Sequence, residues 1–175
     1  MAAAHADIQR DFVRAIGLRE QDTIMARQSG GFRHELSAGL ARLGEYYIRL
    51  GRPKEALERC QEGLTISLKM SNKLEGGHTY MVLAEVYASD EYRDWDRAAW
   101  HFEESVKAFR AVGAQLDVAR AYLAGARISL AKGDGAAREL AEKAREIAAA
   151  RGARPVVEEA EEILARTLRE EEQAQ

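Results

Sequence analysis

Apolar residues recur along the chain at intervals of three and four, which is the spacing of one face of an α-helix. One such stripe contains Leu40, Leu43 and Tyr47, and another begins at Tyr80 and Leu83. Sustained alternation of apolar and polar residues, the mark of a half-buried strand, is absent from the sequence. The pattern predicts an all-α protein with about eight helices, near residues 7–28, 33–50, 53–71, 75–89, 95–112, 116–132, 135–151 and 155–172.

The stripes belong to an internal repeat. Three copies of one pattern follow one another: Leu40-x-x-Leu43-Gly44-x-x-Tyr47 with Ala56 and Cys60, Tyr80-x-x-Leu83-Ala84-x-x-Tyr87 with Ala98 and Phe102, and Tyr122-x-x-Gly125-Ala126-x-x-Ser129 with Ala137 and Ala141. The turn residues Gly30, Asn72, Gly113 and Gly152 are 42, 41 and 39 residues apart. Glycine and asparagine tolerate the left-handed conformation that ends a helix. Each unit of about 40 residues is therefore expected to be two helices and two turns.

Small residues stand at the same place in each copy. Gly44, Ala84 and Ala126 lie where a neighbouring helix must approach closely, and the large residues Tyr47 and Tyr87 fill the space beside that contact. A single helical hairpin cannot bury such a stripe by itself. The sequence therefore predicts antiparallel hairpins that stack on one another and share a continuous core.

These units resemble tetratricopeptide repeats, in which a large residue, Leu-Gly and Tyr on the first helix are followed by Ala and an aromatic residue on the second. The second copy matches at Tyr80, Leu83, Ala84, Tyr87, Ala98 and Phe102. The resemblance implies a right-handed α-solenoid. The period is nearer 40 residues than the usual 34, which resembles the extended repeats of bacterial signalling regulators and of some eukaryotic adaptor proteins.

On this reading the chain forms one array over residues 1–175. A leading helix at 7–28 comes first and a capping helix at 155–172 comes last. Three repeats lie between them, at residues 33–72, 75–113 and 116–152.

The resemblance also implies where a partner would bind, because the first helix of each tetratricopeptide hairpin lines the concave side and commonly holds a peptide or a helix. Carried onto this sequence, the expected partner-binding residues are Ala41, Glu45, Ile48, Arg49, His78, Met81, Glu85, Arg120, Leu123 and Arg127. The alternative is that these residues are only the solvated faces of amphipathic helices. Repeats that clamp a terminal carboxylate need Lys and Asn in the groove, and here Glu45 and Glu85 would repel an anion.

Three large aromatic residues, Tyr92, Trp95 and Trp100, gather near the long connection after Tyr87. Such residues are enriched in binding hot spots. They also fill gaps between helices, and the sequence favours that role here.

Composition narrows the classes of function. The net charge of −3 and the pI near 5.9 argue against nucleic-acid binding, which needs a basic surface. Cys60 is the only cysteine, so an internal disulfide is impossible and a reducing compartment is expected. The sequence has neither a signal-peptide pattern nor a run of about 18 apolar residues. We therefore expect a cytoplasmic protein that does not bind membranes.

Residues with catalytic or metal-binding spacing are missing from the sequence. The four histidines have no second ligand at metal-binding spacing, and no glycine-rich loop joins a strand to a helix. Cys60 takes the place of a core aromatic residue, so a buried, inert thiol is expected. No enzymatic activity, cofactor or metal is predicted.

The sequence thus predicts a non-catalytic scaffold that binds a peptide or helix of another protein in its concave groove. Two alternatives stay open. The array is a self-association module that forms homo-oligomers, or it is the sensor segment of a larger regulatory protein.

Overall fold

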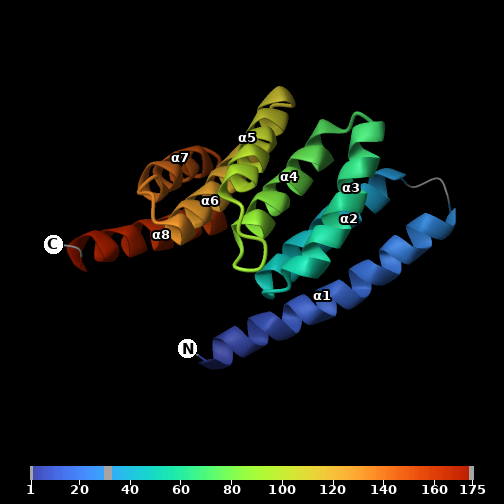
Figure 1. Cartoon of the computed structure of the whole chain (residues 1–175), viewed down its shortest axis with the longest axis horizontal. Coiled ribbons are helices and arrows are strands. Elements are labelled where there is room, and N and C mark those ends of the chain that lie inside the picture. Colours follow the sequence, from blue (N-terminus) through green and yellow to red (C-terminus); the bar gives the residue numbers. More distant parts are fainter. Residues whose placement is uncertain (1, 30–32, 174–175) are drawn as a thin grey trace.

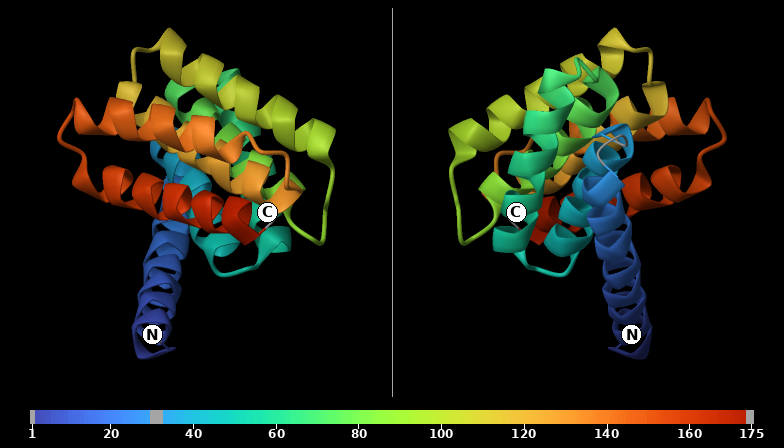
Figure 2. Two further views of the ribbon diagram at one scale, coloured as in Figure 1. Left: turned by 90° about the vertical axis from the view of Figure 1, so that its left-hand side faces the viewer. Right: turned by 90° about the vertical axis from the view of Figure 1, so that its right-hand side faces the viewer.

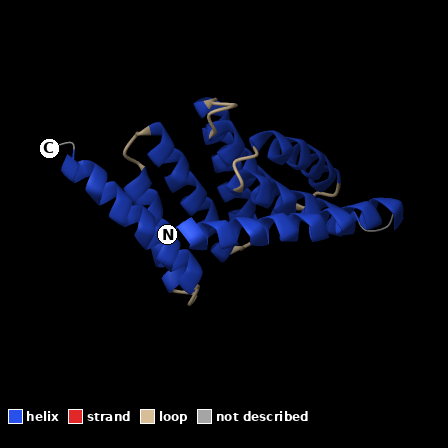
Figure 3. Cartoon of the chain, turned by 90° about the horizontal axis from the view of Figure 1, so that it is seen from below, coloured by secondary structure: helices blue, strands red, loops and turns tan. Residues whose placement is uncertain are grey.

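The computed structural model describes residues 2–29 and 33–173, and all regular structure within these ranges is helical (Figures 1 and 3). Eight helices follow one another there: α1 (Ala2–Ser29), α2 (Arg33–Arg49), α3 (Pro53–Lys69), α4 (Lys73–Ala88), α5 (Trp95–Ala111), α6 (Gln115–Lys132), α7 (Ala137–Ala149) and α8 (Arg154–Gln173). In the described ranges, every helix is too short or too polar to cross a membrane. The predicted all-α class and the number of helices are confirmed.

Local sequence signals set several of the helix ends. Pro53 is the first residue of α3, where its missing N–H is not needed. Asp94 caps α5, and its carboxylate accepts a hydrogen bond from the backbone N–H of Arg97 at 3.0 Å. Gly113 and Gly152 have left-handed backbones with φ of 70° and 66°, as expected of the turns between repeats.

Two local expectations differ from the structure. The first helix begins at Ala2 instead of residue 7. At the end of α3, the left-handed residue is Ser71, with φ of 52°, and not Asn72. Asn72 instead caps α4, because its side-chain oxygen accepts a hydrogen bond from the N–H of Glu75. Gly30, the first turn marker, lies outside the described residues.

The helices form two layers. The inner layer contains α2, α4, α6 and α8, which pack on one another in that order. The outer layer contains α3, α5 and α7, which cover the inner layer from the other side (Figure 2). The helices α3 and α5 both pack on α4 and are not packed against each other. Each helix packs mainly on its neighbours in sequence. The buried apolar residues form two clusters, one from α1 to α4 and one from α4 to α8, so the predicted shared core is divided at α4, which contributes to both.

Small residues hold the layers close together, as predicted. Ala84 and Ala126 are completely buried, and a Cβ atom added to Gly44 would lie less than 3.0 Å from the sulfur of Cys60 on α3. Gly125 of α6 makes room for Phe102 of α5, whose ring would be 2.7 Å from an added Cβ. At the position equivalent to Gly125 the other two copies carry Leu43 and Leu83.

The helix α1 lies against α2 and extends beyond the other helices at its N-terminal end (Figure 2). Its C-terminal half is held by polar contacts. The Glu20 carboxylate accepts hydrogen bonds from the Tyr47 hydroxyl at 2.7 Å and from Arg59 at 3.1 Å, and Arg27 pairs with Glu62 at 2.5 Å. These contacts place α1 beside the inner layer, where it contributes to the candidate site.

Candidate functional site: a groove along the inner helices

Two cavities lie along the face formed by the inner helices. The first cavity, of about 270 Å³, is bounded by α1, α2 and α4. The second cavity, of about 380 Å³, is bounded by α2, α4 and α6. The residues of α2 and α4 that line the first cavity lie nearer the N-terminal ends of these helices. Those that line the second cavity lie nearer the C-terminal ends. We refer to the two cavities together as the inner groove.

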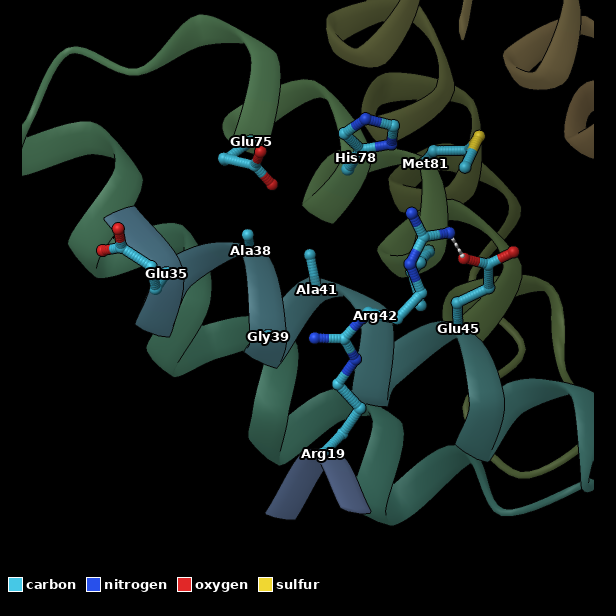
Figure 4. A pocket seen from close by; sticks show the side chains of 11 residues that line it. Arg19, Glu35, Ala38, Gly39, Ala41, Arg42, Glu45, Glu75, His78 and Met81 are labelled. Carbon is cyan, nitrogen blue, oxygen red and sulfur yellow. Dashed lines mark hydrogen bonds and ion pairs between the residues drawn. The ribbon is translucent and has the colours of Figure 1, made fainter. Parts of the chain in front are cut away.

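The first cavity has a small apolar floor and charged walls. Ala38, Ala41 and Met81 form the floor (Figure 4). The carboxylates of Glu35 and Glu75 come from the first turns of α2 and α4, where the helix dipoles stabilise negative charge. A segment that binds here would contact apolar methyl groups below and carboxylates at the rim.

Other charges of the first cavity are paired within the protein. Arg42 contacts Glu45 at 2.7 Å, and Figure 4 shows this pair beside the cavity. His78 lies 3.7 Å from Asp117 and meets the edge of the Phe109 ring. Burial lowers the pKa of His78 below its ordinary value of 6.5, although the Asp117 carboxylate opposes that effect. His78 is therefore a neutral ring at the groove surface at neutral pH.

Four charged side chains form a network at the second cavity, and three of them, Arg49, Glu85 and Arg127, line it. Arg127 of α6 pairs with Glu85 of α4 and with Glu159 of α8. Glu159 also lies 3.6 Å from Arg49 of α2. Burial alone would lower the pKa of Arg127, but Glu85 and Glu159 outweigh burial and hold that pKa above its ordinary value. All four inner helices are thus joined at one end of the groove.

Most of the residues predicted to bind a partner lie in the inner groove. The first cavity is lined by Ala41, Glu45, His78 and Met81, and the second by Ile48, Arg49, Glu85 and Arg127. Arg120 is exposed beside the groove and pairs with Asp117 at 3.1 Å. Leu123 is buried in the core and lines neither cavity, so it is not available to a partner. Ala41 and Met81 are also mostly buried, at 4% and 9% exposure, but both line the first cavity.

The predicted partner-binding set did not include several charged residues that line the first cavity, namely Arg19, Glu35, Arg42 and Glu75. A signal existed for two of them. Glu35 and Glu75 are 40 residues apart, which is the period of the repeat, so the repeat could have identified them as equivalent positions. Arg19 comes from α1, which precedes the three repeats, so the repeat pattern does not indicate it.

The aromatic residues near the long connection take different roles. Tyr92 packs against the core between α2, α3 and α4. Trp100 remains 52% exposed and stands edge-on to Tyr80, with ring centres 5.6 Å apart. Beside it, His101 is buried and stacks on Tyr87, and burial lowers the pKa of His101 to about 4. Trp100 is therefore a surface aromatic residue and not only a filler between helices.

The remaining candidate chemistry is limited. Cys60 is completely buried, and burial raises the pKa of its thiol far above the ordinary value. Among the side chains that the structure describes, no three His, Cys, Asp or Glu residues are grouped so that they could hold a metal ion.

Comparison with known proteins identifies the fold. No known family profile and no curated protein sequence matches the chain. A crystal structure from Podosopora anserina, described as a kinesin light chain with nearly identical TPR-like repeats, is similar in structure, with a TM-score of 0.51. The two chains are 18% identical, and the match covers 94% of this chain and 92% of the other. The protein therefore has the α-solenoid fold of tetratricopeptide-like repeats, a fold that is typically non-catalytic.

Proposed function

We propose that the protein is a non-catalytic interaction module that holds a peptide or helix of another protein in the inner groove. The observation that carries this proposal is the first cavity, where an apolar floor of Ala38, Ala41 and Met81 lies between the carboxylates of Glu35 and Glu75. Apolar floors with polar rims are typical of protein interfaces. A segment with apolar residues at helical spacing and flanking Lys or Arg complements these walls.

In this proposal the charged residues at the second cavity support the fold and are not the main binding contacts. Arg127, Glu85 and Glu159 satisfy one another, so they support the inner layer and leave little free charge for a partner. Their substitution would disturb the stack as well as binding. Glu35 and Glu75, in contrast, stand on first turns at the rim, and a test of binding belongs there.

The test is a selection from a library of random 16-residue peptides displayed on phage, followed by affinity measurements on the purified protein. We expect the selected peptides to combine apolar residues with Lys or Arg. Their affinity should fall about tenfold or more in the double variant Glu35→Lys/Glu75→Lys, because attraction becomes repulsion. A matched control is Glu58→Lys/Glu146→Lys, which changes the net charge equally on the exposed surfaces of α3 and α7.

Equal loss of affinity in both double variants, or none in either, would rule out the inner groove as the binding site. Thermal melting of each variant checks that the fold is intact.

Self-association is a second candidate function, and a feature of α1 favours it. Val13, Leu18, Ile24 and Met25 are all exposed on this one helix. Light scattering over a concentration series distinguishes the two functions. A growing mass that Leu18→Glu/Met25→Glu abolishes would support self-association, and a constant monomer mass would reject it.

A further inference from the structure

A third cavity lies on the side of the molecule away from the inner groove. It has a volume of about 340 Å³ and is bounded by α3 and α5, with the N-terminal half of α4 as its floor. Because α3 and α5 do not pack on each other, a hollow is left between them. Small residues keep it open: Gly76 on the floor, and Ala108 and Ala111 along α5.

The walls of this outer groove are largely apolar. Leu68 of α3 lines it and is 58% exposed, and Tyr80 of α4 lies at its other end. Beyond Tyr80 the half-exposed ring of Trp100 extends the apolar surface along α5. From Trp100 to Ala111 the surface follows about three helical turns, or roughly 16 Å at 1.5 Å per residue. That length suits a short helix lying in the groove.

The charge at the rim is mainly positive. Lys73, Lys107 and Glu104 line the cavity and give it a net charge of +1, because Lys107 pairs with Glu104 at 3.1 Å and Lys73 adds a second positive charge. The N-terminus of α4 begins at Lys73, so the positive end of its dipole lies at the same end of the groove. An occupant that carries carboxylates next to its apolar face is complementary to this rim.

We propose that the outer groove between α3 and α5 is a second docking surface, which binds an acidic amphipathic helix of a partner protein. Its apolar residues would lie along Leu68, Ala108, Ala111 and Tyr80, with one edge against Trp100. Its Asp or Glu side chains would lie near Lys73 and Lys107. The inner groove, with its free carboxylates, selects the opposite charge. The two faces of the array therefore bind segments of different sign.

The experiment uses the same kind of random 16-residue display library, with the variant Ala111→Trp as a counter-selection. Ala111 is exposed and lines the outer groove, so the added indole fills the hollow without entering the core. The matched control is Ala99→Trp, an exposed position on α5 that does not line the cavity. A charge variant, Lys73→Glu/Lys107→Glu, is compared with Lys54→Glu/Lys132→Glu.

We expect a class of peptides with apolar residues at helical spacing and with Asp or Glu between them. Their affinity falls about tenfold or more with Ala111→Trp and with Lys73→Glu/Lys107→Glu, and it is unchanged in both matched controls. Emission of Trp100, measured in a Trp95→Phe background, shifts on binding. These peptides keep their affinity for Glu35→Lys/Glu75→Lys, so this result is independent of the inner groove.

Three outcomes would overturn the proposal. In the first, no selected peptide binds Ala111→Trp more weakly than the original protein. In the second, the peptides that lose affinity for Ala111→Trp are basic. In the third, their affinity for Ala99→Trp falls equally. Sedimentation tests the remaining occupant, a second copy of this chain. If the protein self-associates and Ala111→Trp abolishes this, the occupant of the outer groove is a second copy of this chain and not a helix of a partner protein.

Discussion

Gly44 shows how a single missing side chain sets the distance between two helices. Its backbone in α2 faces the sulfur of Cys60 in α3, and a Cβ atom there would lie less than 3.0 Å from that sulfur. Gly17, in contrast, is also inside a helix but has no atom within 4 Å of the position of an added Cβ. Comparing an alanine substitution at Gly44 with one at Gly17 therefore separates the effect of packing on stability from the effect of helix propensity.

We predict that Gly44→Ala destabilises the protein by about 1–3 kcal/mol, because overpacking exceeds the gain in helix propensity. Gly17→Ala should instead stabilise α1 by about 0.5–1 kcal/mol. Urea denaturation measures both changes. Adding Cys60→Ala to Gly44→Ala should recover most of the loss, since the sulfur is the atom in the way. Independent, additive effects of the two substitutions would mean that Gly44 does not control this contact.

His101 makes the stability of the fold depend on pH. Its ring is buried, its Nδ1 atom has no hydrogen-bond partner, and its pKa is lowered to about 4 from an ordinary value of 6.5. Above pH 6.5 the ring is neutral in both the folded and the unfolded chain. As the pH falls from 6.5 to about 4, only the unfolded chain takes up the proton, so the stability contributed by the neutral ring is lost over this window.

We predict a loss of about 2 kcal/mol in the free energy of unfolding between pH 7 and pH 5 from this residue alone. Other groups titrate in the same range, so the comparison is with His101→Phe, which keeps a ring and removes the proton. Denaturant melts at both pH values give the difference between the two proteins. Identical pH dependence in both would show that His101 is not the titrating group.

At the scale of helices, the repeat made most of the fold predictable. The stripe that contains Leu43 and Tyr47 fixed which faces are buried, and the regular turns fixed where the chain reverses. The pattern could not predict which of two adjacent residues takes a given backbone or capping role, nor which side chains meet between repeats. Ser71 takes the left-handed backbone so that Asn72 can cap α4, and either residue could have done either task. Phe102 fills the space above Gly125, a contact between repeats that spacing within one repeat does not reveal.

The inner groove was predictable to a similar extent. The resemblance to tetratricopeptide repeats placed Ala41, Glu45 and Met81 on the concave side, and helical spacing put Ala41 and Glu45 on one face of α2. The same reasoning put Leu123 on the surface, where the structure buries it. Leu123 belongs to the core cluster to which α4, α5, α6, α7 and α8 all contribute, so α6 is covered from more than one side. Curvature is the sum of many small rotations, and no short motif encodes it.

At the scale of the whole molecule, the charge network around Arg127 connects helices that are far apart in sequence. Arg127 joins α6 to both α4 and α8, and Glu159 also reaches Arg49 of α2. The remaining contacts of the stack are mainly between neighbours in sequence. The network is therefore suited to fix the curvature of the inner face and, with it, the width of the groove.

We predict that Arg127→Met destabilises the protein by about 2 kcal/mol, because Glu85 and Glu159 lose their shared partner in a largely covered site. Circular dichroism should show unchanged helix content, and small-angle X-ray scattering should show a larger radius of gyration as α8 moves away from α2. Arg93→Met is the matched control, since its pair with Asp90 is exposed and should contribute less than about 0.5 kcal/mol. An unchanged radius of gyration in a destabilised Arg127→Met protein would mean that the network adds stability without setting the curvature.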